Sequence, residues 1–229
     1  MDNILLRPIK TEIEYHGQFA AVAFKLLANP IPIYEGFLEA FRKYGVSLRD
    51  IKYEGSVLSE ANISCTLLNF NVLVRVRLDR LEVTFFRLDI IDEKAANQIA
   101  VDAWNVVKAT DDSVGVVQHG VTVATHVELP STLSYDALLQ RYVVAPLELK
   151  RHTRSGVVFY LGEDQARGQT GGSILLDRSI LKDGALYIKV SAVFDAAKIP
   201  INSVGASMDG FFTSQLGNLG LVLERAERK

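Results

Sequence analysis

Two arginines on one side of a predicted strand offer the first candidate chemistry, which is the binding of an anion. In the segment 72–78, Arg75 and Arg77 alternate with apolar residues, so both side chains point to the same side of the strand. A second basic group, the run from Lys150 to Arg154, lies in the other half of the chain. A phosphate site would need the two groups to converge on one surface. We predict that Arg75 and Arg77 are binding residues.

A long polar loop between residues 162 and 172 is the second candidate. Glycine-rich loops can cradle phosphate groups, but no Lys-Ser or Lys-Thr pair follows these glycines, so the loop is not a P-loop. Polar surface loops are nevertheless where binding residues tend to collect. The predicted binding residues of this loop are Gly162, Glu163, Asp164, Arg167, Gly171 and Gly172.

The histidines raise the question of a metal site. His16 and His119 each precede a glycine within a strand-like segment, and we interpret the two His-Gly pairs as equivalent positions of a repeat. A pair of imidazoles at a repeat axis could hold a metal ion, but neither a Cys/His cluster nor a helical His-x-x-x-His accompanies them. We therefore predict no metal and no cofactor, and interpret each pair as a structural bend or bulge.

Residues for covalent catalysis are scarce. Cys65 is the single cysteine and lies in an apolar strand, which favours a small buried hydrophobic residue over an activated thiolate. The segment from Gly205 to Gly210 has the wrong spacing for a Gly-x-Ser-x-Gly nucleophile elbow. We predict no catalytic residue, although an active site assembled from distant residues stays an alternative.

The predicted strands and helices that would position these residues occur twice along the chain in a similar order. Each His-Gly strand is followed by a proline and then by an apolar stripe at helical spacing. Several alternating strands come next, and each copy closes with a longer helix, predicted at about 92–109 and 203–224. The two stripes are Tyr34, Phe37, Leu38 and Phe41 in the first copy and Tyr135, Leu138, Leu139 and Tyr142 in the second.

This order predicts an α+β fold made of two internally duplicated β-α-β-β-β(-β)-α units. Antiparallel sheets with helices on one face, related by a pseudo-two-fold axis, are expected. The boundary lies near residues 111–113, which gives an N-terminal unit at 1–112 and a C-terminal unit at 113–229. One unit alone would leave a strand edge unpaired, so we expect the two sheets to join.

By element order alone, the predicted topology resembles the duplicated saddle of the TATA-binding-protein fold and, more distantly, ligand binders with a helix on a curved sheet. The resemblance carries no functional residue across. A DNA-binding saddle would need a basic concave face, whereas the chain has 25 Lys+Arg against 27 Asp+Glu. The charge balance therefore argues against a nucleic-acid partner.

The remaining composition is that of an ordinary globular protein. The 229 residues are 48% hydrophobic, yet no apolar run is long enough to span a bilayer and no secretory signal is recognised. A lone cysteine fits a reducing cytoplasm.

We predict a non-enzymatic binding or assembly protein, whose curved sheet or helix groove binds another protein or a second copy. The alternative is a binder of apolar small molecules, with a pocket between helix and sheet lined by residues such as Phe85, Trp104, Phe194 and Phe212.

Overall fold

The computed structural model describes residues 3–55, 57, 59–88, 93–143 and 156–224. Its first part contains β1 (Ile4–Phe19), α1 (Phe24–Ala28), α2 (Ile31–Ala40), two 3-10 turns η1 (Arg42–Tyr44) and η2 (Leu48–Asp50), β2 (Ile51–Glu54), β3 (Asn62–Leu67), β4 (Val72–Arg77), β5 (Arg80–Phe85) and α3 (Glu93–Thr110). The second part contains β6 (Val116–Glu128), α4 (Tyr135–Gln140), β7 (Val157–Leu161), the 3-10 turn η4 (Gln165–Arg167), β8 (Gln169–Arg178), β9 (Leu186–Asp195), α5 (Ile201–Asn218) and β10 (Leu221–Leu223).

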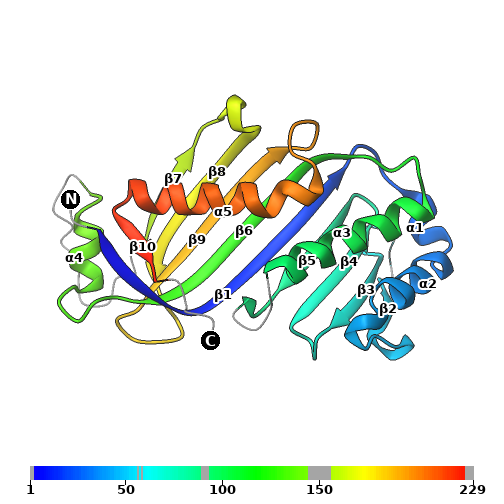
Figure 1. Ribbon diagram of the computed structural model, residues 1–229, viewed down its shortest axis with the longest axis horizontal. Coiled ribbons are helices and arrows are strands. Elements are labelled where there is room, and N and C mark those ends of the chain that lie inside the picture. Colours follow the sequence, from blue (N-terminus) through cyan, green and yellow to red (C-terminus); the bar gives the residue numbers. More distant parts are fainter. Residues whose placement is uncertain (1–2, 56, 58, 89–92, 144–155, 225–229) are drawn as a thin grey trace.

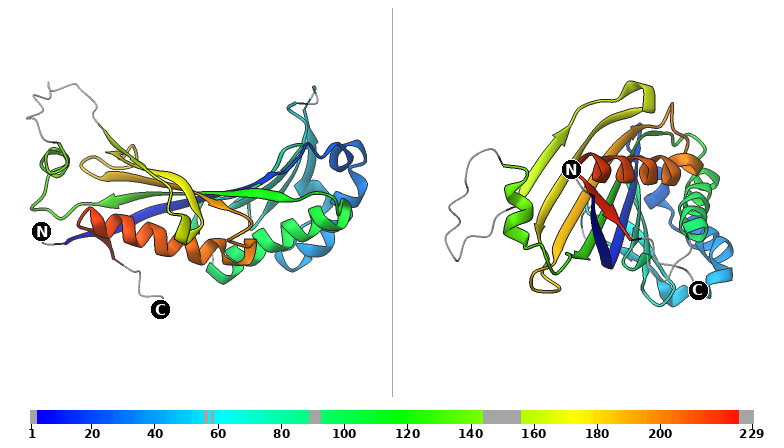
Figure 2. Two further views of the ribbon diagram at one scale, coloured as in Figure 1. Left: turned by 90° about the horizontal axis from the view of Figure 1, so that it is seen from above. Right: turned by 60° about the vertical axis from the view of Figure 1, so that its left-hand side comes forward.

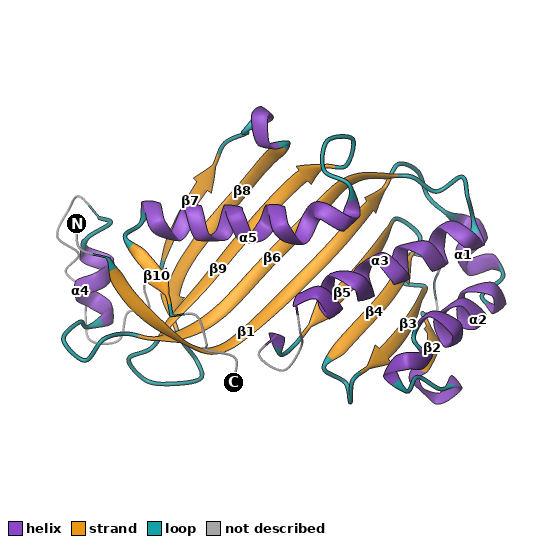
Figure 3. Cartoon of the chain, viewed as in Figure 1, coloured by secondary structure: helices purple, strands orange, loops and turns teal. Residues whose placement is uncertain are grey.

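All ten strands belong to one mixed sheet that is almost entirely antiparallel (Figures 1 and 3). The strand order is β2-β3-β4-β5-β1-β6-β9-β8-β7, and β10 adds a short parallel pairing to the start of β1. The long strands β1 and β6 pair with each other at the centre of the sheet. The sheet is therefore continuous from the N-terminal strands to the C-terminal ones.

Both long helices, α3 and α5, lie on the same face of this sheet (Figure 2). The sheet bends away from them, so the opposite face is concave, and no described helix covers it. Strands β4 and β5 show the resulting pattern, because buried and half-buried residues alternate along both. The side that faces the helices forms the hydrophobic core, and the concave side is called the open face below.

Small residues allow the helices to pack closely. A Cβ placed on Gly36 of α2 would lie 2.6 Å from a methyl group of Val106 in α3, so glycine is required there. Gly205 of α5 faces Asn97 of α3, whose side-chain oxygen would lie 3.3 Å from an added Cβ. Close packing against α3 therefore accounts for Gly205. It does not account for Gly210 and Gly217, where an added Cβ would meet no atom within 4 Å.

Three sequence predictions of secondary structure need correction. The helix expected over 203–224 ends at Asn218, because Gly220 adopts a positive φ of 70° and Leu221–Leu223 form β10. The first His-Gly strand was expected to lead directly to its proline, but it ends at Phe19 and the helix α1 begins at Phe24, before Pro30. The loop expected up to Gly172 is shorter, because β8 begins at Gln169. In the described part of the chain, no helix is long and apolar enough to cross a membrane.

Candidate functional site

A cluster of charged side chains lies on the open face, on β4 and β5. The valines of β4 are buried on the helix side, so Arg75 and Arg77 face the open side. On β5, Leu81 is buried, and its neighbours Arg80 and Glu82 therefore also face the open side. The register sets Arg75 directly opposite Glu82. These four residues, Arg75, Arg77, Arg80 and Glu82, are called the arginine cluster.

The carboxylate of Glu82 is the centre of the arginine cluster. Nη1 of Arg75 donates to Oε2 at 3.2 Å, while Nε of Arg77 and Nε of Arg80 donate to Oε1 at 3.1 Å and 2.6 Å. Arg80 also pairs with Asp79, with Nη1 and Oδ2 3.0 Å apart. Nε of Arg75 is buried and finds no hydrogen-bond partner among the described residues. Three guanidiniums thus face two carboxylates, which leaves the group with a net positive charge.

Electrostatics fix the charge state of this cluster. Burial alone would raise the pKa of Glu82, but the hydrogen bonds and positive charges of Arg80 and Arg77 outweigh it and hold the pKa below its ordinary value. The hydrogen bond to Glu82 in turn raises the pKa of Arg80. Glu82 and Arg80 are therefore both ionised at neutral pH. An incoming anion would meet guanidiniums that are already held in place.

His16 extends the open face onto the central strand β1. It pairs with Glu82 on one side and with Gly120 on the other. Its ring covers Gly120, because an added Cβ there would lie 2.0 Å from Nε2 of His16. Partial burial and the positive charge of Arg80 lower the pKa of His16, and the charges of Glu82 and Glu14 offset only part of this. The imidazole is therefore neutral at pH 7.

His119 lies on the helix side of the sheet and is buried. Its Nδ1 is 3.0 Å from the hydroxyl oxygen of Tyr15, and the register places His119 opposite Gly17. Glycine is needed at position 17, because an added Cβ would lie 2.7 Å from that hydroxyl oxygen. Burial lowers the pKa of His119, and a hydrogen bond with the backbone of Ile199 offsets part of this. The pair is a satisfied polar contact within the core.

The interpretation of the two His-Gly pairs as equivalent positions is wrong. The register pairs His16 with Gly120 and Gly17 with His119, and neighbours in a strand point to opposite faces. The two imidazoles therefore lie on opposite sides of the sheet and cannot share a metal ion. The glycines make room for rings, whereas the register shifts of the β1–β6 pair lie elsewhere, between Pro8 and Lys10 and between Gln18 and Phe19. Across the described residues, no three His, Cys, Asp or Glu side chains gather as a metal site.

The predicted loop 162–172 forms a compact turn followed by a strand. Gly162 and the exposed Glu163 precede η4, and Asp164 accepts a hydrogen bond from the backbone nitrogen of Arg167 at 3.3 Å. The other carboxylate oxygen of Asp164 is 3.5 Å from Nε of Arg167. Gly168 ends the turn with a φ of 65°. The turn thus holds Arg167 beside α5.

The last two glycines of that loop lie within β8. A Cβ on Gly172 would be 2.6 Å from the carbonyl oxygen of Ser191 and 3.3 Å from the ring of Phe211. A Cβ on Gly171 would meet no atom within 4 Å. Gly172 is therefore explained by packing under α5, and the geometry gives neither glycine a role in binding phosphate.

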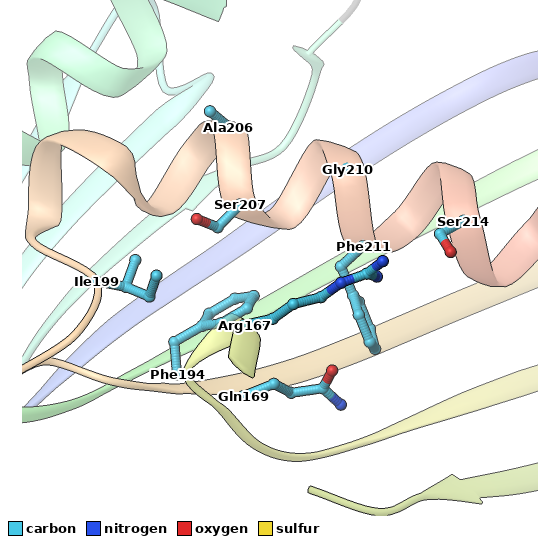
Figure 4. A pocket seen from close by; sticks show the side chains of 9 residues that line it. All are labelled: Arg167, Gln169, Phe194, Ile199, Ala206, Ser207, Gly210, Phe211 and Ser214. Atoms are coloured by element: carbon cyan, nitrogen blue, oxygen red, sulfur yellow. The ribbon is translucent and has the colours of Figure 1, made fainter. Parts of the chain in front are cut away.

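A pocket of about 380 Å³ opens beside this turn, between α5 and the strands beneath it (Figure 4). Figure 4 shows α5 above the pocket, Phe194 and Gln169 below it, the side chain of Arg167 between them, and Ile199 at one end. Of the four aromatic residues predicted to line a pocket between helix and sheet, Phe194 is the one that lines this pocket. Phe85 and Phe212 are buried in the core, and Trp104 packs against Phe19 with 6.3 Å between the ring centres.

The predicted site residues therefore fall into two separate groups. Arg75 and Arg77 come together on the open face, joined by Arg80 and Glu82, which the sequence analysis did not single out. Arg75 and Arg77 lie on β4, and strands β5, β1, β6 and β9 separate this strand from the 162–172 segment. The basic run 150–154 lies outside the described residues. The sequence did hold a signal for Glu82, because it alternates with apolar residues along β5 as Arg75 does along β4.

Cys65 is fully buried, and burial, with a smaller effect of Asp50, raises the pKa of its thiol to about 12. This confirms the prediction of a small buried hydrophobic residue rather than a reactive thiolate.

No protein-family model matches the chain, and the search of curated proteins finds no similar sequence.

Proposed function

We propose that this protein is a non-enzymatic binding protein, whose open face accepts an acidic segment of another protein through the arginine cluster. The observation that carries the proposal is the arrangement of Arg75, Arg77 and Arg80 around the single carboxylate of Glu82. An acidic side chain from a partner can add a third carboxylate to the three guanidiniums, which already pair with Glu82 and Asp79.

The shape of the molecule supports this use of the open face. Both long helices lie on the opposite side, so the core is already closed without any covering of the concave surface (Figure 2). The arginines are only about one quarter exposed along their side chains, at 28% for Arg75 and 26% for Arg77. Arginines held so firmly lose less conformational entropy when they bind than long flexible side chains do.

The distribution of charge favours a protein segment over a nucleic acid. Glu14 pairs with Thr84 and Thr122 at the middle of the sheet, on the same side of β1 as His16. A continuous phosphate backbone that left the arginine cluster along the sheet would meet this carboxylate, and the repulsion would weaken binding. A protein segment can place its acidic residues on the arginines and neutral or basic residues beyond them.

We also propose that the two halves, 1–112 and 113–229, arose by duplication and are related by a pseudo-two-fold axis. Three features support this: α3 and α5 both have 18 residues, β1 pairs with β6 at the centre, and α3 meets α5 at Asn97 and Gly205. In this view the arginine cluster belongs to one copy only, so binding would be asymmetric.

The test is a titration of the protein into fluorescent poly-glutamate, with poly-lysine and a single-stranded oligonucleotide as comparison probes. The double variant Arg75→Gln/Arg77→Gln should weaken poly-glutamate binding at least ~10-fold, since about 1.4 kcal/mol corresponds to tenfold. Binding should also weaken as the salt concentration rises.

Arg178→Gln is the matched control, because Arg178 is also a strand arginine paired with a carboxylate, that of Asp136, 2.6 Å away. It should leave binding unchanged. Equal loss in both variants, or no binding of poly-glutamate by the unaltered protein, would overturn the proposal. Oligonucleotide binding that depends on Arg75 and Arg77, without poly-glutamate binding, would replace the partner with a nucleic acid. A concentration-dependent mass that the double variant abolishes would make the partner a second copy.

A further inference from the structure

We infer that the pocket beside η4 is a second binding site, which takes a small molecule with one carboxylate and an apolar body. The site is independent of the arginine cluster. It lies under α5 on the helix side of the sheet, whereas the arginine cluster lies on the open face.

Two buried rings and an isoleucine form the apolar part of the pocket. Phe194 and Phe211 are buried and meet edge to face, with 6.4 Å between ring centres and an angle of 84° between ring planes. Ile199 lies beside them in the turn that leads into α5. Such a surface favours an apolar or aromatic body, because burying it against rings removes apolar area from water.

The polar groups of the pocket include a single charge. Figure 4 shows the guanidinium of Arg167 directed beneath α5, with the side chains of Ser207 and Ser214 on the helix above and that of Gln169 below. No carboxylate side chain lines the pocket, and the partner of Arg167, Asp164, is 3.5 Å away in the adjacent turn. Arginine matches a carboxylate with two parallel N–H donors, and hydroxyl and amide donors can complete the shell.

Small residues of α5 leave space for the pocket. Ala206 and Gly210 are the small residues of α5 that line it. Glycine inside a helix costs roughly 1 kcal/mol relative to alanine, and Gly210 is not required by packing, because an added Cβ would meet no atom within 4 Å. The cavity of about 380 Å³ is near the lower end of the ~300–1,000 Å³ typical of small-ligand sites, so the ligand is small.

The test is calorimetric titration with 3-phenylpropionate, compared with the uncharged 3-phenylpropionamide and with inorganic phosphate. The acid should bind, and the amide and phosphate should bind at least ~10-fold more weakly, because each lacks one of the two features that the pocket recognises. Arg167→Gln should weaken binding of the acid by a similar factor. Asp164→Asn should strengthen it severalfold, since the competing carboxylate is lost while a side-chain oxygen remains to accept from the backbone nitrogen of Arg167.

Two glycine variants of α5 separate blocking of the pocket from general damage to the helix. Gly210→Leu places a side chain into the pocket and should abolish binding of 3-phenylpropionate. Gly217→Leu is the control, because Gly217 lies in the same helix, also has no atom within 4 Å of an added Cβ, and does not line the pocket. Thermal melts of both variants check that they are folded.

Equal affinity for the acid and the amide would overturn the inference, and so would unchanged binding in Gly210→Leu. Arg75→Gln/Arg77→Gln should bind 3-phenylpropionate normally, so failure of this site and failure of the open face are distinguishable.

Discussion

Neighbouring residues of the same strand have different roles, because they lie on opposite faces of the sheet. On β5, Leu81 is fully buried against the helix side, while its neighbour Glu82 gathers three arginines on the open face. On β1, Tyr15 contacts the buried His119, while the next residue, His16, lies on the open face. Buried contacts that stabilise the fold thus lie on one face, and charged side chains lie on the other. Substitutions on the two faces should therefore alter stability and binding separately.

The largest difference between the faces should appear in the free energy of unfolding of β5 variants. Leu81→Ala removes a fully buried side chain and should cost about 3 kcal/mol. Thr84→Ala, on the open side of the same strand, should cost less than about 0.5 kcal/mol. Chemical denaturation of the two variants measures both values, and similar losses would contradict the division of the faces.

The buried Tyr15–His119 pair should show the next largest effect. Tyr15→Phe removes the hydroxyl and leaves Nδ1 of His119 without this partner in the core, which should cost about 1–2 kcal/mol. His16→Gln, one residue later on the open face, is the comparison variant and should change stability far less. Urea unfolding curves check both. A neutral Tyr15→Phe would mean that the hydrogen bond contributes nothing.

The arginine cluster should show a smaller effect on stability and an opposite effect on binding. Glu82→Gln leaves three guanidiniums without their shared anion, which should destabilise the protein by about 1 kcal/mol. It should also strengthen the binding of poly-glutamate, because a competing carboxylate is removed. Chemical denaturation together with the titration into fluorescent poly-glutamate tests this. Weaker binding by Glu82→Gln would contradict the assigned role of the cluster.

The smallest effects should appear in the dependence of stability on pH. Burial lowers the pKa of His119 and of His16, so between pH 7 and 5 the unfolded chain binds more protons and stability falls as pH falls. The pKa of Glu82 is also lowered, so its contribution is present above the ordinary glutamate pKa and is lost only at lower pH. Unfolding curves from pH 7 to 3 measure both windows. Rising stability toward pH 5 would contradict these pKa directions.

The sequence predicted the local features of the faces well, because they depend on short periods. Alternation along 72–78 predicted the common facing of Arg75 and Arg77, and helical periodicity predicted α3 to within one residue at each end. The cap of α4 is equally local, since the side chain of Ser134 accepts a hydrogen bond from the backbone nitrogen of Ala137 three residues later.

Features that depend on distant pairing were missed. Residues 221–223 continue the apolar pattern of α5, yet they form a strand because Gly220 turns the chain and β1 supplies a partner. The N-terminal part of β1 was hidden by Pro8, which lies between the residues that pair with β10 and those that pair with β5. The His-Gly error has a similar origin, since matching dipeptides say nothing about which face a register selects.

The pocket could not be predicted as a whole, because Arg167, Phe194 and Ser207 come from a turn, a strand and a helix with no common pattern in the sequence. The sequence did single out Arg167 through its unusual loop, and it singled out Phe194 as an aromatic residue between helix and sheet.

The most direct test of the central claim follows the arginine side chains themselves. Nuclear magnetic resonance of the Nε–Hε groups, recorded while poly-glutamate is added, reports on each guanidinium separately. We predict that the signals of Arg75, Arg77 and Arg80 shift together and saturate, while that of Arg178 stays in place. Signals of the arginine cluster that do not move, or that move no more than that of Arg178, would contradict the assignment of the open face as the binding surface.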